Sequence, residues 1–163
     1  MITNKKIKLN ILSLFDGIGC SRLALNQCSN IEVKKYYYSE IDQNCINLTN
    51  KKFSSDIFLG PVEKINPKLL PKIDLLIGGS PCQDLSNAHK GNGLKGIRSS
   101  LFYRFINLKK TLKPKYFLLE NVKNKWSKVM DKEIGVKGIE LNSMFLSGQY
   151  RPCLLYTSPS PRD

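Results

Sequence analysis

Short apolar runs recur along the chain and alternate with segments of helical periodicity. The runs have the length and the branched side chains of buried strands, and turn or charged residues bound them. They are Lys8–Leu14, Lys35–Ser39, Asp56–Leu59, Ile73–Ile77, Lys115–Leu119 and Gly138–Asn142. The segments that favour a helix are Arg22–Gln27, Gln43–Lys51, Ser100–Leu112 and Trp126–Glu133. This alternation predicts an α/β fold with a doubly wound, mostly parallel sheet.

The 163 residues show no internal repeat and no linker, so they predict one domain with a hydrophobic core. No apolar run approaches the roughly 20 residues of a membrane helix, and the first residues show neither a long apolar signal core nor a small-residue cleavage site. The five cysteines are odd in number and show no C-x-x-C spacing, which disfavours a disulfide framework and a zinc site. We therefore expect a cytoplasmic protein with reduced thiols, no membrane contact and no metal.

The net charge of +13 favours a nucleic-acid partner only weakly. Lysine is far more common than arginine, and asparagine and isoleucine are also abundant, a composition typical of an AT-rich genome. Much of the lysine is therefore expected to be solvated surface.

Chemically active side chains follow several predicted strands, at the edge where open α/β sheets bind their ligands. A turn with Gly17 and Gly19 follows the first strand and precedes a helix, as in nucleotide-binding units. Glu40 ends the second strand, roughly 20 residues later, where such units bind ribose hydroxyls; the alternative is a solvated carboxylate. Cys82 lies directly beyond the fourth strand, and Glu120 follows the fifth. These positions predict one site at the carboxyl edge of the sheet.

A thiol and a carboxyl group beside a nucleotide-type cofactor suit attack on an electron-poor ring. A cysteine protease is disfavoured, because no histidine is placed to generate the thiolate. The only histidine, His89, lies in a glycine-rich, basic segment at 87–99, which we expect to form a lid and in which we assign His89 no role.

The chain resembles the cytosine-5 DNA methyltransferases from about Leu9 to Arg151. The motifs that carry this resemblance are FDGIGCSRLAL (Phe15–Leu25), SEID (Ser39–Asp42), GGSPCQDLS (Gly78–Ser86), RSSLF (Arg98–Phe102) and ENV (Glu120–Val122). Pro-Cys-Gln and Glu-Asn-Val at this spacing are specific to the family in combination, whereas each motif alone is not.

The resemblance implies a Rossmann-like methyltransferase fold that uses S-adenosyl-L-methionine. The implied activity is methylation of carbon 5 of cytosine in DNA, by an enzyme of the restriction-modification or phage type. Cys82 would attack carbon 6 of the ring, Glu120 would protonate nitrogen 3, and Arg151 would complete the catalytic set. The cofactor-binding residues that the resemblance implies are Phe15, Asp16, Gly17, Ile18, Gly19, Glu40, Ile41, Val62, Pro81 and Leu101.

Within this set, the resemblance places Phe15 and Ile41 against the adenine and Glu40 on the ribose hydroxyls. Residues 16–19 would line the methionine end of the cofactor. The implied partner is double-stranded DNA with a flipped base, over whose phosphates the basic lid would close, and a cognate restriction endonuclease is an expected functional partner.

Two positions depart from the family pattern. Pro61 stands where an aspartate usually meets the adenine amino group, so we expect cofactor binding to be weaker by about 1 kcal/mol. Gln149 and Arg151 match the family's Gln-x-Arg-x-Arg motif, whereas Cys153 stands where its second arginine is expected.

The last eleven residues, CLLYTSPSPRD at 153–163, resemble a translated sequencing adaptor. We therefore interpret residues 1–152 as an incomplete catalytic domain without its target-recognition domain, and residues 153–163 as a non-native tail that adds no packed element. We expect apolar side chains to be exposed on the sheet face beside the first strand, and the chain as written to be inactive.

Three alternatives remain open. The same chemistry would methylate cytosine in RNA, since Cys82 and Glu120 do not distinguish the two substrates. A dinucleotide-dependent oxidoreductase with a structural Cys82 is disfavoured, because Arg22 occupies the position of the third glycine of G-x-G-x-x-G. A non-catalytic nucleic-acid-binding relative is disfavoured by the presence of both chemical residues.

Overall fold

A seven-stranded sheet forms the centre of the protein, in the strand order β3-β2-β1-β4-β5-β7-β6. The computed structural model describes residues 6–81, 99–145 and 147–159. The strands are β1 (Ile7–Leu14), β2 (Ile31–Ser39), β3 (Ile57–Phe58), β4 (Leu75–Gly79), β5 (Tyr116–Val122), β6 (Ile139–Asn142) and β7 (Pro152–Thr157). The first five strands are parallel to one another, and β7 is antiparallel to both β5 and β6. The predicted mostly parallel α/β sheet is confirmed.

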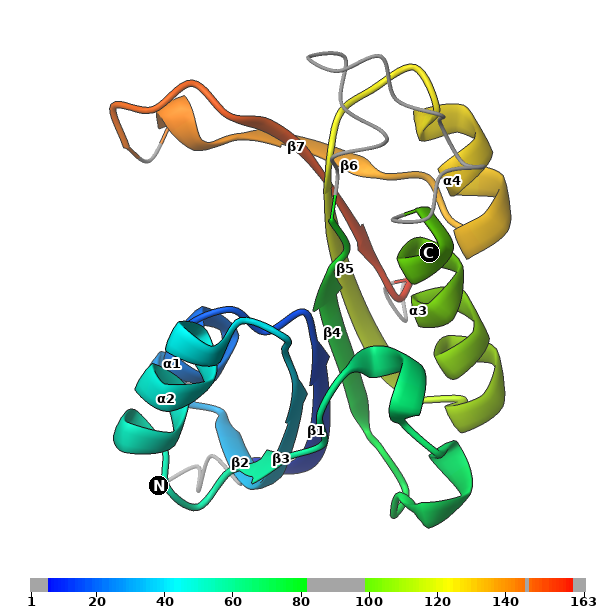
Figure 1. Cartoon of the computed structure of the whole chain (residues 1–163). Helices are drawn as coiled ribbons and strands as arrows, with labels where there is room; N and C mark the ends of the chain where they lie inside the picture. The colour runs from blue at the N-terminus through cyan, green and yellow to red at the C-terminus, as the bar shows by residue number, and fades with distance from the viewer. Residues whose placement is uncertain (1–5, 82–98, 146, 160–163) are drawn as a thin grey trace, which may run out of the picture.

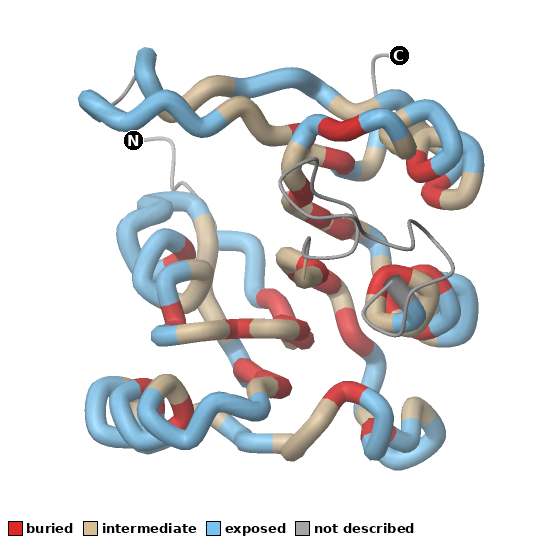
Figure 2. The backbone as a smooth tube through the Cα atoms, turned by 45° about the horizontal axis from the view of Figure 1, so that its top comes forward, coloured by how far each residue is buried: buried red, intermediate tan, exposed pale blue. Residues whose placement is uncertain are grey.

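Helices cover both faces of the sheet (Figure 1). They are α1 (Cys20–Gln27), α2 (Gln43–Lys52), α3 (Ser99–Leu112) and α4 (Ser127–Ile134). One apolar core joins β1, β4 and β5 to α3 and α4, and a second joins β1 and β2 to α1. Figure 2 shows the buried stretches concentrated along the strands. None of the helices in the described part of the chain has the length and hydropathy to span a bilayer.

The apolar face over β4 and β5 is only partly covered, because α1 and α2 lie over β1 to β3 (Figure 1). Leu75, Ile77 and Tyr116 pack against the second core but stay half-buried. On β1 itself, Leu9 and Ile11 are buried. The partly exposed apolar side chains on this face therefore lie on β4, directly beside the first strand, and on β5 next to it.

Strand β5 is longer than the sequence predicted. Glu120 lies inside the strand, whereas the apolar pattern placed it just beyond the end. The strand continues because Gly79 pairs with Glu120 on one side and β7 pairs with residues 118–122 on the other. Backbone hydrogen bonding to two neighbours thus fixes the carboxyl group on a rigid element.

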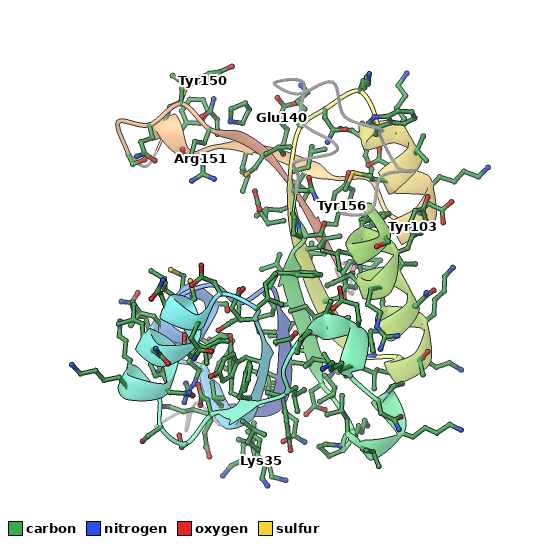
Figure 3. The ribbon with its side chains drawn as sticks, in the orientation of Figure 1. Lys35, Tyr103, Glu140, Tyr150, Arg151 and Tyr156 are labelled. Atoms are coloured by element: carbon green, nitrogen blue, oxygen red, sulfur yellow. The ribbon has the colours of Figure 1, made fainter. Side chains whose placement is uncertain are left out.

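Residues 152–157 form strand β7, and the expectation that the tail adds no packed element is wrong for this part of it. Leu154 and Tyr156 alternate along β7 toward the core between the sheet and helices α3 and α4, and they are 6% and 0% exposed (Figure 3). Tyr156 packs so closely over Gly138 that a Cβ atom there would lie 2.9 Å from its ring. Successive side chains of a strand point to opposite faces, so a segment whose buried apolar residues are two positions apart can form a strand whatever its origin.

The connection between β6 and β7 extends away from the body of the protein (Figure 1). Large apolar side chains on this hairpin, Leu141, Met144, Phe145 and Tyr150, are exposed. The Asn142 side chain holds the base of the hairpin by accepting hydrogen bonds from the backbone N–H groups of Met144 and Arg151.

Candidate active site

The loop between β1 and α1 turns sharply at the carboxyl edge of the sheet. Phe15, Gly17 and Gly19 have φ angles of 57°, 60° and 77°, in the left-handed region. A side chain at Gly19 would meet the ring of Phe53 at 3.1 Å, so the close approach of α2 also requires glycine there. The N–H of Asp16 donates to the Ser39 carbonyl oxygen and ties the loop to the end of β2.

The carboxylate of Asp16 anchors this loop from inside. Its Oδ1 atom accepts hydrogen bonds from the hydroxyl groups of Ser13, Ser21 and Tyr36, at 2.5, 3.0 and 2.6 Å. The pKa of Tyr36 is raised, mainly by burial and secondly by the negative charge of Asp16. Its hydroxyl group therefore keeps its proton and remains a donor. The second oxygen, Oδ2, is buried and has no hydrogen-bond partner among the described residues.

Glu40 connects the loop to the start of α2. Its Oε2 accepts a hydrogen bond of 2.7 Å from the N–H of Gly17, and its Oε1 accepts from the N–H groups of Ile41 and Asp42. A carboxylate has about four acceptor positions, so three backbone donors leave room for a further donor such as a ribose hydroxyl.

A cavity of about 300 Å³ opens beside Glu40. Its lining residues are Phe15, Ser39, Glu40, Ile41, Val62, Glu63, Gly79, Pro81 and Leu101. Six of the ten residues proposed for the cofactor are thus brought together; residues 16–19 lie in the adjoining loop and do not line this cavity. Three lining residues were not predicted from the sequence: Ser39, Gly79 and Glu63. Of these, only Glu63 could have been proposed, because it directly follows Val62, which was predicted to bind the cofactor.

Glu120 of β5 lies next to this cavity, across Gly79. Its Oε2 is 3.5 Å from the position that a Cβ atom at Gly79 would occupy, so glycine leaves room for the carboxyl group. Burial raises the pKa of Glu120, and the Arg151 guanidinium partly opposes this shift. Arg151 lies at the start of β7 (Figure 3), so the two predicted catalytic residues are near enough to interact electrostatically. Cys153 is also close, because the charge of Glu120 contributes to the raised pKa of its thiol.

Asn121 links β5 to the segment that precedes Cys82. Its buried amide nitrogen donates to the hydroxyl and carbonyl oxygens of Ser80, at 2.8 and 3.2 Å. Its side-chain oxygen accepts from the N–H of Val122. Cys82 itself and the proposed basic lid with His89 lie outside the described residues. Within those that are described, no group of three or more His, Cys, Asp or Glu side chains could hold a metal ion.

The model of one protein family, described as C-5 cytosine-specific DNA methylase, matches residues 9–144. The chain belongs to this family of cytosine methylases. It is 41% identical over 118 residues to the orphan methyltransferase M.Rho11sI of Bacillus phage rho11s, and 40% identical over 120 residues to the type II methyltransferase M1.ScrFI of Lactococcus lactis subsp. cremoris. These matches cover 71% and 74% of the chain. The methylase chain spans only 23% and 30% of the length of these two relatives.

A solved structure shows the same methylase fold. It is that of a protein described as a DNA modification methyltransferase encoded within a prophage of E. coli. The two structures superpose with a TM-score of 0.66 over 91% of this chain and 46% of the other, at 24% sequence identity. This likeness concerns the fold alone.

A buried ion pair joins helix α1 to the segment that precedes β3. Arg22 on α1 donates to Asp56 at 3.1 Å, with side chains that are 14% and 2% exposed. The guanidinium group also lies over the rings of Tyr36 and Phe53, with its central carbon 5.6 and 5.5 Å from their centroids. Sequence reasoning missed this pair, because 34 residues separate its members and no motif contains both.

Asp56→Ala is expected to lower the free energy of unfolding of the methylase by about 3 kcal/mol, because it leaves the Arg22 charge largely buried without its partner. Burial raises the pKa of Asp56 despite the opposing effect of Arg22, so the buried carboxylate itself adds little stability. Replacing both residues, as Arg22→Met with Asp56→Leu, should therefore cost less than the single change. Urea unfolding followed by circular dichroism measures both.

The matched control is the exposed pair of Lys8 and Glu32, whose side chains are 65% and 45% exposed. Glu32→Ala should change the free energy of unfolding by less than about 1 kcal/mol. Equal losses in Asp56→Ala and Glu32→Ala would contradict the assignment of a supporting role to the buried pair.

Proposed function

We propose that the chain is the cofactor-binding and catalytic part of an enzyme that methylates carbon 5 of cytosine in double-stranded DNA. The observation that carries the proposal is the position of Gly79. This residue lines the cavity that Glu40 borders, and Glu120 lies directly against it. A cofactor in that cavity would therefore be next to a carboxyl group whose pKa is raised.

The residues of the cavity fit S-adenosyl-L-methionine. Phe15, Ile41, Val62 and Leu101 offer apolar walls for the adenine, and Glu40 offers an anchored acceptor for a ribose hydroxyl. When bound, the cofactor supplies an electrophilic methyl group. The loop at residues 16–19 would hold its methionine end.

The protein residues would make carbon 5 of cytosine a nucleophile. The thiolate of Cys82 adds to carbon 6, and Glu120 donates its proton to nitrogen 3, so that electrons move to carbon 5. Carbon 5 takes the methyl group, and the donor sulfur keeps the electron pair of the broken bond. A base such as water then removes the proton from carbon 5, the thiolate leaves carbon 6 as the ring double bond re-forms, and nitrogen 3 returns its proton to the Glu120 carboxylate. Burial favours the protonated form of Glu120 that the first step needs.

DNA must present the cytosine outside the duplex for this reaction, because a stacked base cannot reach the end of β4. The net charge of +13 suits contact with phosphates, for which the basic segment at 87–99 is the proposed lid. We also propose that the enzyme acts in the cytoplasm of a bacterial or phage-infected cell. A cognate restriction endonuclease would be its functional partner. Residues 153–163 remain, in our interpretation, a tail of non-native origin.

A covalent trap tests the chemistry. Residues 1–152 are joined to the part of a curated relative that follows the equivalent position, so that its residues take the place of β7. This extended enzyme is incubated with S-adenosyl-L-methionine and DNA that contains 5-fluorocytosine. Fluorine at carbon 5 cannot leave as a proton would, so the Cys82 adduct should accumulate and resist denaturation. Cys82→Ser should abolish it, whereas Cys45→Ser, a control on α2, should not.

An adduct that persists in Cys82→Ser would refute the assignment of the nucleophile. The same trap with RNA that contains 5-fluorocytosine distinguishes the two polynucleotides: preferential trapping on RNA would favour the RNA methyltransferase. Hydride transfer to NAD without any adduct would favour the oxidoreductase.

A further inference from the structure

Two glutamate side chains border the cofactor cavity, and they differ in what already binds them. Glu40 accepts three backbone hydrogen bonds. Glu63 lies in the short 3-10 helix η1 (Val62–Lys64), is exposed to solvent, and forms no ion pair with any described residue. Within the lining of the cavity, Glu63 is therefore the carboxylate with the greater remaining capacity to accept hydrogen bonds.

The backbone that presents Glu63 is held from two sides. Arg104 of α3 donates to the carbonyl oxygens of Val62 and Ile65. The hydroxyl of Ser39 donates at 2.7 Å to the carbonyl oxygen of Gly60, just before η1. The side chains of Val62 and Ile65 are also buried. Glu63 is thus placed at the cavity by a fixed turn, so that only its side-chain torsions have to be ordered when a ligand binds.

The neighbouring Pro61 offers no hydrogen-bonding side chain and no N–H donor. The other side chains from this part of the wall, Val62 and Leu101, are apolar. A purine between them would have one carboxylate acceptor near its edge, and the purine group that matches an acceptor is an exocyclic amine.

We propose that Glu63 accepts a hydrogen bond from the 6-amino group of the cofactor's adenine and so sets the preference of the site for that base. This assignment rests on the proposed use of S-adenosyl-L-methionine. It gives Glu63 a role in base recognition, distinct from that of Glu40 at the ribose.

The test compares two ligands in the 163-residue chain. One is S-adenosylhomocysteine, and the other is its analogue with unsubstituted purine, which lacks only the 6-amino group. The dissociation constants are measured by NMR titration, which also detects weak binding. Wild-type protein should bind the adenine ligand about tenfold more tightly, the effect of one hydrogen bond to a charged acceptor.

In Glu63→Ala this ratio should fall to about one, because the amine then has no acceptor. Glu63→Gln keeps an amide oxygen as an acceptor, so it should restore part of the preference. Glu133→Ala, on α4, is the matched control and should retain the wild-type ratio. A ratio within one protein is independent of how much of the sample is folded, so partial unfolding of a variant would not change it.

A wild-type ratio that persists in Glu63→Ala would overturn the assignment and leave the proposed function intact. Equal binding of both ligands by the wild type would also overturn the assignment of Glu63 and leave the proposed function intact. Binding of neither ligand by the wild type would instead contradict the proposed function, and the role of Glu63 with it.

Discussion

In the extended enzyme, Glu120→Gln is expected to slow methyl transfer by about 1,000-fold and to leave the affinity for S-adenosyl-L-methionine unchanged. Glutamine has nearly the same shape, but it cannot release a proton to nitrogen 3 of the ring. The side chain is half-buried on β5, where Gly79 gives it room, so the substitution requires no movement of the backbone. Single-turnover rates and calorimetric titration measure the two quantities.

The pH profile of the wild-type enzyme gives an independent check on Glu120. Because burial raises the pKa of this acid, its protonated, active form should persist to higher pH than that of an ordinary glutamate. Arg151 opposes the shift, so Arg151→Leu should raise the pKa further and move the alkaline limb of kcat/KM to higher pH. A limb that moves to lower pH would contradict this electrostatic coupling.

The control for Glu120→Gln is Glu140→Gln. Glu140 lies on β6 and pairs with Lys123 at 2.7 Å, with both side chains about half exposed. Its substitution should leave both the rate and the affinity near the wild-type values. Unchanged turnover in Glu120→Gln would remove Glu120 from the proposed mechanism.

Truncation of the chain after Pro152 is expected to lower the free energy of unfolding by more than about 5 kcal/mol, which is the whole stability of many domains. The cut removes most of β7, whose buried Leu154 and Tyr156 contribute about 2 kcal/mol each by burial. It also removes the ladder hydrogen bonds to both β5 and β6. Urea unfolding monitored by tryptophan fluorescence, from Trp126 beside this core, measures the loss.

Truncation after Ser158 is the matched control. It keeps β7 and the hydrogen bond of 3.0 Å in which the N–H of Phe117 donates to the Ser158 hydroxyl. Its unfolding midpoint should match that of the whole chain. If the two truncated chains unfold at the same urea concentration, β7 does not contribute to the stability of the sheet.

The parallel half of the fold could be predicted from the sequence because its signals are local. A buried parallel strand is a short apolar run, and the turns at Gly19 and after Gly79 use residues that mark a change of direction. The same runs place Glu40 and Glu120 near one edge of the sheet. The end of β5 was predicted less well. From the sequence alone Glu120 lies just beyond the strand, and only its pairing with Gly79 shows that it lies inside it.

The features that sequence reasoning missed depend on contacts between distant segments. Strand β7 was dismissed on the proposed origin of its residues, although Leu154 and Tyr156 alternate as an amphipathic strand requires. The pair of Arg22 and Asp56 forms only when α1 lies beside the start of β3. Glu63 became a candidate for base recognition only when η1 was seen to border the cavity.

Residue 79 is a glycine, so at this position only backbone atoms separate the cavity from the carboxyl group of Glu120. A methyl group there would lie 3.5 Å from Oε2 of Glu120, in van der Waals contact, and a longer side chain would compete with the carboxyl group for the same space. In the proposed enzyme, one backbone segment would therefore set the separation between the methyl donor and the acid, with no side chain of residue 79 between them.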